Sequence, residues 1–360
     1  MKLQFVIGAA GVIAGLVLPA YSKCPVNNTS VLVIKADTGD LQIDTNGKEP
    51  FVDIQTDAGK INENCGNQMI EYTGSGAHIW KVTTPRDIDL DLATIGGNIT
   101  VTDVDGDVFL RTSGGSVTVG NVRGSAAIVT QGGPIKTGRI GGNAEMRTPG
   151  TIEVGDIGGN ADLRTANGKI VTGIIGGSRA DAEAGRTIVI PKAGEVKAIT
   201  TQGDISIGEA ARINAKSGGG QITTRRVHGP FQGHTEDGDI RLDYAGSWVE
   251  ASTGHGNILV HMFPENLDGD LHMDLQAGVG DVTVYLPPRL RASIDATIQR
   301  PAFQSQGIIS DFPVTPHRPA QSLIPDPKYY APSHSESFIN GGGNKISLHT
   351  SFGGITIRKN

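Results

Sequence analysis

Aspartates cluster at residues 103–107, where the sequence reads DVDGD. Closely spaced carboxylates beside a glycine are the ligands that calcium loops use, but this run lacks the D-x-D-x-D-G spacing and the distal glutamate. Calcium-binding nonapeptide repeats need an aspartate after the glycine of every turn, and here Pro134 and Lys169 occupy that position in two copies. We therefore interpret the aspartates as polar turn residues.

Three histidines, His234, His255 and His261, fall within two neighbouring repeats of the sequence. A zinc site needs three or four ligands that converge on one point. Asp237 and His255 occupy the same position in successive repeats, so we expect them to form a surface pair rather than part of a metal site. No metal ion or other cofactor is expected.

Signatures of catalysis are missing from the sequence. It contains no G-x-S-x-G nucleophile elbow and no phosphate loop in a strand–helix context. A pair of carboxylates for glycoside hydrolysis would need a cleft, and only residues 263–268 and 287–340 are long enough to wall one. We therefore expect that the protein is not an enzyme, and a polysaccharide-active enzyme is an alternative.

A threonine–glycine motif recurs at a fixed interval and organises most of the chain. Each copy reads T-x-x-G followed by alternating polar and apolar residues, as in TIGGNITV and TSGGSVTV. The interval is 18 residues, with one step of 17. The threonine position is held by Thr94, Thr112, Thr130, Thr148, Thr165, Ser217, Thr235, Thr253 and Thr350.

The alternation within each unit predicts short strands with one buried face. Val117 and Val119 should face the core and Thr118 the solvent. Glycine, at 51 of 360 residues, fits tight turns, and the glycine three residues after each threonine suits a positive φ. An 18-residue unit cannot bury its apolar face alone, so the units must stack. The sequence therefore predicts an all-β parallel β-solenoid, or β-helix, with two short strands per 18-residue coil. A β-propeller needs longer blades with aromatic signatures.

The first 22 residues have the features of a secretory signal peptide. Lys2 precedes an uncharged, mostly apolar run, and small residues then allow cleavage after Ser22. Lipidation at Cys24 is the alternative, but Lys23 spoils the small-residue site that it requires. No other segment is long and apolar enough to cross a membrane. The protein is therefore expected to be secreted or periplasmic.

Beyond the signal peptide we expect three segments. Residues 23–286 form the solenoid, with irregular first coils to about residue 87. Residues 287–340 form a Pro-rich insertion or cap that shields one open end of the sheet. Residues 341–360 return to the repeat as a final coil.

Cys24 and Cys65 are the only cysteines in the chain. After export both would lie in an oxidising compartment, where disulfides form and persist. We expect a bridge between them; two unpaired thiols are the alternative.

Charges of both signs are spread along the chain, with a formal net charge of −6. This balance argues against a nucleic-acid binder. The outward position just before the repeated threonine holds an arginine in several coils, and an acid lies two residues earlier in two of them, so that stacked coils interleave acids and bases. The resulting patch is a candidate docking surface for glycans or envelope proteins, and otherwise a solvated face with cross-strand charge pairs. It consists of Arg111, Glu145, Arg147, Asp162 and Arg164.

Three sequence features carry a resemblance to a known family: the recurrent T-x-x-G-[DN]-I-x-V motif, the segment GIISDFPV and the closing NGGGNKISLHTSFGGITIRK. Through them the chain resembles a family of bacterial adhesin-like proteins. These are built from β-strand-repeat domains, also called toast-rack domains, of unknown function. The resemblance implies an extracytoplasmic, non-catalytic domain used in attachment or in envelope-stress sensing. We therefore expect a binding or scaffolding protein such as an adhesin. A sensory or structural envelope component that works with a membrane partner is an alternative.

Overall fold

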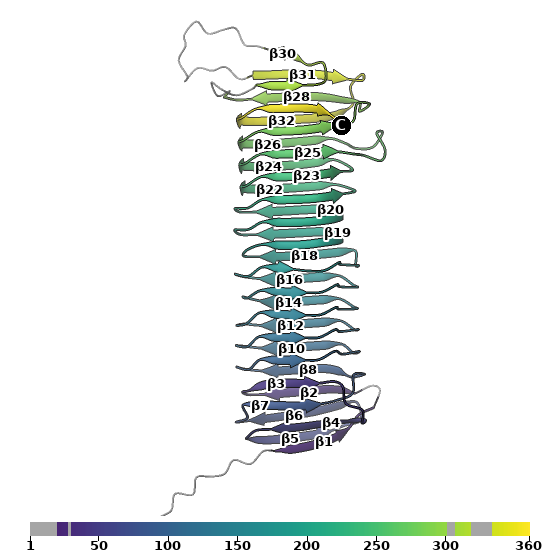
Figure 1. The fold of residues 1–360 in the computed structure, drawn as a ribbon, viewed down its shortest axis with the longest axis vertical. Helices are drawn as coiled ribbons and strands as arrows, with labels where there is room; N and C mark the ends of the chain where they lie inside the picture. Colours follow the sequence, from purple (N-terminus) through teal and green to yellow (C-terminus); the bar gives the residue numbers. More distant parts are fainter. Residues whose placement is uncertain (1–19, 28–29, 301–306, 318–332) are drawn as a thin grey trace, which may run out of the picture.

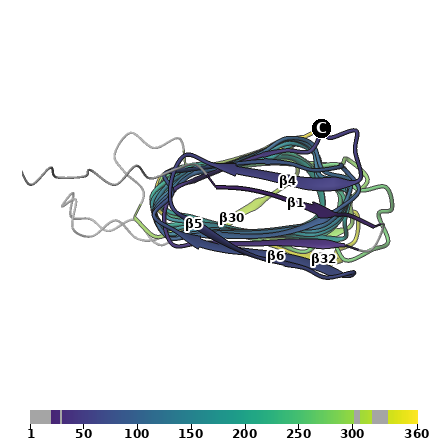
Figure 2. The same ribbon diagram turned by 90° about the horizontal axis from the view of Figure 1, so that it is seen from below.

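The computed structural model describes residues 20–27, 30–300, 307–317 and 333–360, and within these ranges it contains β-strands and no helix. The strands belong to one sheet that winds into a tall column (Figure 1) with a flattened cross-section (Figure 2). The all-β prediction is confirmed, and the arrangement is solenoid-like. The signal peptide predicted for residues 1–22 lies outside the described residues except for its last three. No described segment is a helix with the length and apolarity needed to cross a membrane.

Most coils contribute one strand to each broad side of the column, which we call face A and face B. Face A contains β8 (Asp89–Thr94), β10 (Val108–Thr112), β12 (Ala126–Thr130), β14 (Ala144–Thr148), β16 (Ala161–Thr165), β18 (Arg179–Ala184), β22 (Phe231–Asp237), β24 (Val249–His255) and β26 (Met273–Val279). Face B contains β9 (Ile99–Val101), β11 (Val117–Val119), β13 (Ile135–Thr137), β15 (Ile152–Val154), β17 (Ile170–Val171), β21 (Ile222–Val227), β23 (Ile240–Ala245), β25 (Ile258–Met262) and β27 (Val282–Leu286). Two long strands, β19 (Ile188–Thr200) and β20 (Ile205–Ser217), run from face B around the corner to face A.

Strand pairing follows the sequence period. Ala126 on β12 lies beside Val108 in the coil before it and Ala144 in the coil after it, in parallel and 18 residues away each time. One step is longer, because Val249 pairs with Met273 and the intervening residues loop out before β26. The coils therefore stack in the register that the threonine spacing predicts.

Five successive coils also have a third paired position, which the two-strand prediction missed. Single residues between the face B strand and the next face A strand form parallel bridges with the coils above and below: Val104, Val122, Ile140, Ile157 and Ile175. All five are buried. They pack the narrow corner of the flattened column, which a coil of only two strands would leave open.

The core is one continuous cluster of buried apolar side chains that runs along the column. Val117 and Val119 are buried and Thr118 is exposed, which confirms the predicted alternation. The buried ring of Phe231 occupies the space above Gly233, where an added Cβ would lie 2.5 Å from the ring. Such pairing of a large with a small side chain keeps the packing dense.

The repeated threonine joins each turn to the turn below it. Thr112 Oγ1 donates to the carbonyl oxygen of Gly97 over 2.7 Å, and Thr130 Oγ1 donates to that of Gly115 over 2.6 Å. These threonines are buried, so the hydrogen bond satisfies a hydroxyl that would otherwise be costly to bury.

The glycine of the motif is needed mainly because successive turns approach closely, which corrects the prediction that it needs a positive φ. A Cβ on Gly115 would lie 2.0 Å from the carbonyl oxygen of Gly97. Neither glycine has a positive φ. Positive φ values occur at this position toward both ends of the chain, for example 90° at Gly59, 145° at Gly238 and 152° at Gly256.

The N-terminal end of the column is built out of sequence order. It comprises β1 (Tyr21–Pro25), β2 (Val31–Ala36), β3 (Asp40–Asp44), β4 (Phe51–Thr56), β5 (Lys60–Cys65), β6 (Met69–Ser75) and β7 (Ile79–Thr83). The coil formed by β2 and β3 lies between β6–β7 and β8–β9. At the outermost end β1 pairs with β4, and β5 pairs with β6, both antiparallel. The parallel prediction is therefore wrong for the outermost strands, whereas β2 and β3 pair in parallel with their neighbours.

The C-terminal end is also built out of sequence order. It comprises β28 (Ala292–Ile298), β29 (Ile308–Ser310), β30 (Thr315–His317), β31 (Ser333–Ile339), β32 (Asn344–Phe352) and β33 (Ile355–Lys359). The last coil, β32–β33, lies between β26–β27 and β28–β29. The antiparallel strand β31 then covers β28, and the short β30 pairs with β31.

A disulfide joins Cys24 on β1 to Cys65 on β5, with the Cα atoms 5.5 Å apart. It links two edge strands at the N-terminal end, which have no further coil to pair with. Cys24, Cys65 and Glu63 are also the one group in the described part of the chain whose atoms are close enough to hold a metal. Because the two sulfurs are bonded to each other, they are not the thiolates that bind zinc.

Gly115→Ala should lower the free energy of unfolding by about 1–3 kcal/mol, the usual cost of overpacking. Gly96→Ala is the matched control, because a Cβ there meets no atom within 4 Å. Chemical denaturation of both variants checks this. Equal stability of the two would show that turn stacking does not require the glycine.

Reduction of the Cys24–Cys65 bridge should destabilise the N-terminal end. The closed loop spans 41 residues, for which the chain-entropy model gives about 3–4 kcal/mol. Limited proteolysis of a Cys24→Ser/Cys65→Ser variant should show early cleavage before residue 87 and none in the central coils. An unchanged cleavage pattern would contradict this.

Candidate binding surface

All five residues of the predicted surface lie on face A; four of them are exposed and Asp162 is half-buried. Arg111 is on β10, Glu145 and Arg147 are on β14, and Asp162 and Arg164 are on β16. The register places Glu145 beside Asp162, and Arg147 beside Arg164. The repeat period therefore located the strands and the outward positions correctly.

Four of the five residues form one ion-pair network. Arg147 contacts Glu145 within its own strand, and its Nη2 lies 3.6 Å from Asp162 Oδ2 on the next strand. Arg164 Nη2 lies 3.2 Å from Asp162 Oδ1, and its Nε lies 3.7 Å from Glu183 Oε2 on β18. Sequence reasoning missed Glu183, because β18 lacks the motif that aligns the other copies.

Arg111 lies outside this network. Its Nη2 is 3.1 Å from Asp91 Oδ1 on β8, and its guanidinium lies over the ring of Phe109 at 4.2 Å. Val129, on the strand between β10 and β14, separates it from Arg147. The predicted surface is therefore two clusters on one face.

Opposite charges nearly cancel over these clusters. Three arginines (Arg111, Arg147 and Arg164) face four acids (Asp91, Glu145, Asp162 and Glu183), which leaves 3 − 4 = −1. Exposed pairs of this kind contribute little to stability individually. Their guanidinium and carboxylate groups are suited to hydrogen bonding with a polar partner.

A shallow recess of about 570 Å³ lies beside the network. Its lining includes Val129, Pro149 and the side chains of Arg147, Arg164 and Glu183. The recess combines an apolar floor with charged edges, the combination found where proteins bind ligands.

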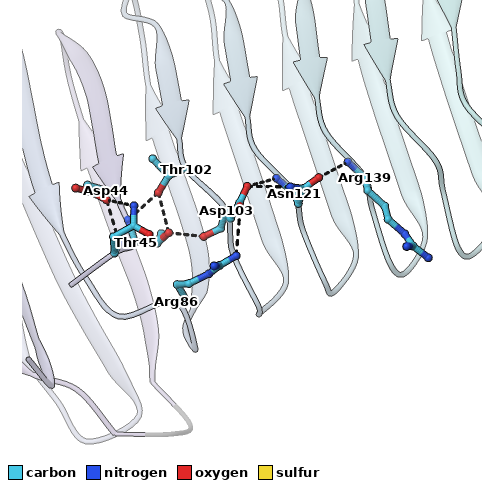
Figure 3. Close-up of polar contacts among 8 residues, drawn as sticks. Asp44, Thr45, Arg86, Thr102, Asp103, Asn121 and Arg139 are labelled. Atoms are coloured by element: carbon cyan, nitrogen blue, oxygen red, sulfur yellow. Dashed lines mark hydrogen bonds and ion pairs between the residues drawn. The ribbon is translucent and has the colours of Figure 1, made fainter. Parts of the chain in front are cut away.

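The aspartates at residues 103–107 hold turns together. Asp103 Oδ1 accepts the backbone N–H of Asn121 over 2.7 Å, and Asn121 Oδ1 accepts that of Arg139 over 2.9 Å (Figure 3). Asp107 Oδ1 accepts the backbone N–H of Ser125 in the same way. Each side chain thus bonds to the same position one coil later, in agreement with their interpretation as polar turn residues.

The three histidines do not converge. His234 Nδ1 contacts Ser252 Oγ on face A at 2.8 Å, while His261 lies on face B. His255 Nδ1 lies 2.8 Å from Asp237 Oδ1, so these two form the expected surface pair one coil apart.

Aromatic rings stack between coils near the end of face B. The rings of Tyr244 and Phe263 lie 5.5 Å apart at 21°, and the guanidinium of Arg226 lies 4.7 Å from the Tyr244 ring centroid. His261 packs on Tyr285 with 4.2 Å between centroids, and burial lowers the pKa of His261. Because neighbours cover the ring faces, these side chains stabilise the stack.

Comparisons with known proteins show little. No protein-family model matches the chain, and no curated protein matches it by sequence. Among solved structures it is similar to a putative cell adhesion protein from Clostridium sporogenes ATCC 15579. That likeness has 10% identity and a TM-score of 0.17, and covers 95% of this chain and 100% of the other. Values this low bear on neither the fold nor the function of this chain.

Asp162→Asn removes the carboxylate that Arg147 and Arg164 share. Because both arginines are exposed and Asp162 is only half-buried, the loss of stability should be less than about 1 kcal/mol. Glu153→Gln on face B is a control of the same charge change. Thermal unfolding of both variants checks this. A loss of several kcal/mol for Asp162→Asn alone would mean that the network holds the fold together.

Proposed function

We propose that the protein is an exported, non-catalytic binding and scaffolding protein of the adhesin type. Its broad face A is the binding surface, and its partners are glycans or envelope proteins. The observation that carries this proposal is the register of face A, where equivalent outward side chains lie side by side from coil to coil. Such a surface offers many equivalent contacts along one direction.

The short turns support a binding role over a catalytic one. The hydrogen bonds between successive turns hold them close to the column, so little chain is left to wall a deep cleft. Catalytic and small-molecule sites usually lie in enclosed pockets, whereas the recess beside Arg147 and Arg164 is shallow.

The Cys24–Cys65 disulfide supports the exported location, because such bonds persist in oxidising compartments. Secretion through a cleaved signal peptide, with the mature chain beginning at Lys23, belongs to the same proposal. Cleavage there would remove Tyr21 and Ser22 from β1 and leave the cysteine in place.

The test replaces Arg111, Glu145, Arg147, Asp162 and Arg164 together with serine and measures binding to isolated cell-envelope material. Binding should fall, and raised salt should reduce wild-type binding in the same way. A control with the same charges removed from face B carries serine at Lys136, Glu153, Arg225, Arg241 and Asp243.

Circular dichroism should show that both fivefold variants remain folded. Equal binding by the face A variant, the face B control and the wild type would contradict the proposed surface. Turnover of any glycan in a panel by the wild-type protein would contradict the non-catalytic assignment.

A further inference from the structure

A second polar groove runs along face A in the C-terminal half of the column. One shallow cavity of about 480 Å³ extends from β20 to β26, and another of about 350 Å³ extends from β26 to β28. Both are lined by Asp274 and Gln276, so they form one continuous channel. We call it the C-terminal groove.

Two rows of outward side chains border this groove, one pair from each of six strands. The first row is Asn214, Gln232, Glu250, Asp274, Ser347 and Asp295; the second is Lys216, His234, Ser252, Gln276, His349 and Thr297. All twelve can form hydrogen bonds. The same rows in the N-terminal half include apolar side chains, such as Phe109, Val129 and Ile199.

Carboxylates in the groove lack the arginine partners found lower on the same face. The rows hold three acids and one lysine, a net charge of 1 − 3 = −2 with neutral histidines. In the described chain no lysine or arginine lies within ion-pair distance of Glu250, Asp274 or Asp295; the basic contacts there are His272 and His334.

Amide groups orient two of these acids instead. Gln232 Nε2 donates to Glu250 Oε2 over 2.9 Å, and Gln276 Nε2 donates to Asp274 Oδ1 over 3.1 Å. Each carboxylate keeps acceptor capacity for a further donor. Asp162, by contrast, already faces two arginines.

We propose that the C-terminal groove binds a linear glycan that carries free amino groups, lying along the axis of the column. Successive pairs of side chains recur at the strand spacing of about 4.8 Å, close to the length of one hexose in an extended β-1,4-linked chain. Hydroxyls would bond to the amide, hydroxyl and imidazole groups, and protonated amines to the acids. This rests on the proposed function, because it takes glycan binding to be the work of face A.

The same features disfavour other polymers. A net negative groove repels uronic-acid glycans and nucleic acids. A peptide would need pockets for apolar side chains, and the rows contain none. Six strands span five spacings, or about 24 Å, so affinity should rise with chain length up to five or six sugars.

The experiment is calorimetric titration at slightly acidic pH, where the glucosamine amines carry protons and the carboxylates stay ionised, with β-1,4-linked glucosamine hexamer as the probe. Wild-type protein should bind it at least about tenfold more tightly than the fully N-acetylated hexamer, and raised salt should weaken binding. Asp274→Asn/Asp295→Asn should lose about tenfold in affinity. Glu153→Gln/Asp243→Asn on face B is the control for equal charge loss and should bind like the wild type.

Three results would overturn the proposal: no binding of the glucosamine hexamer, equal binding of both hexamers, or equal loss in the face A and face B variants. Hexalysine that binds as tightly as the glucosamine hexamer would also overturn it, because the groove would then recognise charge alone. Any of these, with envelope binding that still depends on face A, would leave the proposed function standing. If envelope binding also proved independent of face A, both the glycan proposal and the proposed function would be contradicted.

Discussion

Backbone contact between successive turns is the constraint on which the rest of the structure depends. The turn of one coil rests directly on the turn below, so Gly115 can carry no side chain where it meets Gly97. The hydroxyls of Thr112 and Thr130 occupy the space just inside and bond to the glycine carbonyls. This contact fixes the coil length near 18 residues, and a fixed coil length keeps outward side chains in straight rows. The proposed binding surfaces are consequences of that register.

A stack of parallel coils has no natural end, and an open end would expose strand edges that can pair with other chains. Both ends solve this problem by folding the chain back. The coil β2–β3 is held between strands that follow it in sequence, and β32–β33 is held between strands that precede it. Antiparallel strands then cover each end, and the Cys24–Cys65 bridge ties the N-terminal edge strands together.

The regular middle of the fold could be predicted from the sequence because its coil length and its inward positions are set by patterns within each repeat. The spacing of the threonines defined the coil, and alternation placed Val119 inside and Thr118 outside. The reason for the glycine was misjudged, since the close approach of Gly115 to Gly97 involves a neighbouring coil and leaves no mark on local φ. The interleaved ends rest on pairings between strands distant in sequence, which a period cannot reveal.

The candidate surfaces, too, could be predicted from the sequence only where the repeat motif is intact. Arg147, Asp162 and Arg164 were found because they sit beside intact motifs, whereas Glu183 was missed beside a degenerate one. The C-terminal groove was invisible in the sequence, because Asp274 and Asp295 come to lie on either side of Ser347 only when β32 inserts between their strands.

In the proposed function, an extended face that the turns hold in register binds the partner. Hydroxyl-radical footprinting of side chains, with and without bound envelope material, tests it most directly. Outward residues on face A should be protected in several consecutive coils, with face B unchanged. Protection confined to face B, or to a single turn or loop, would contradict it.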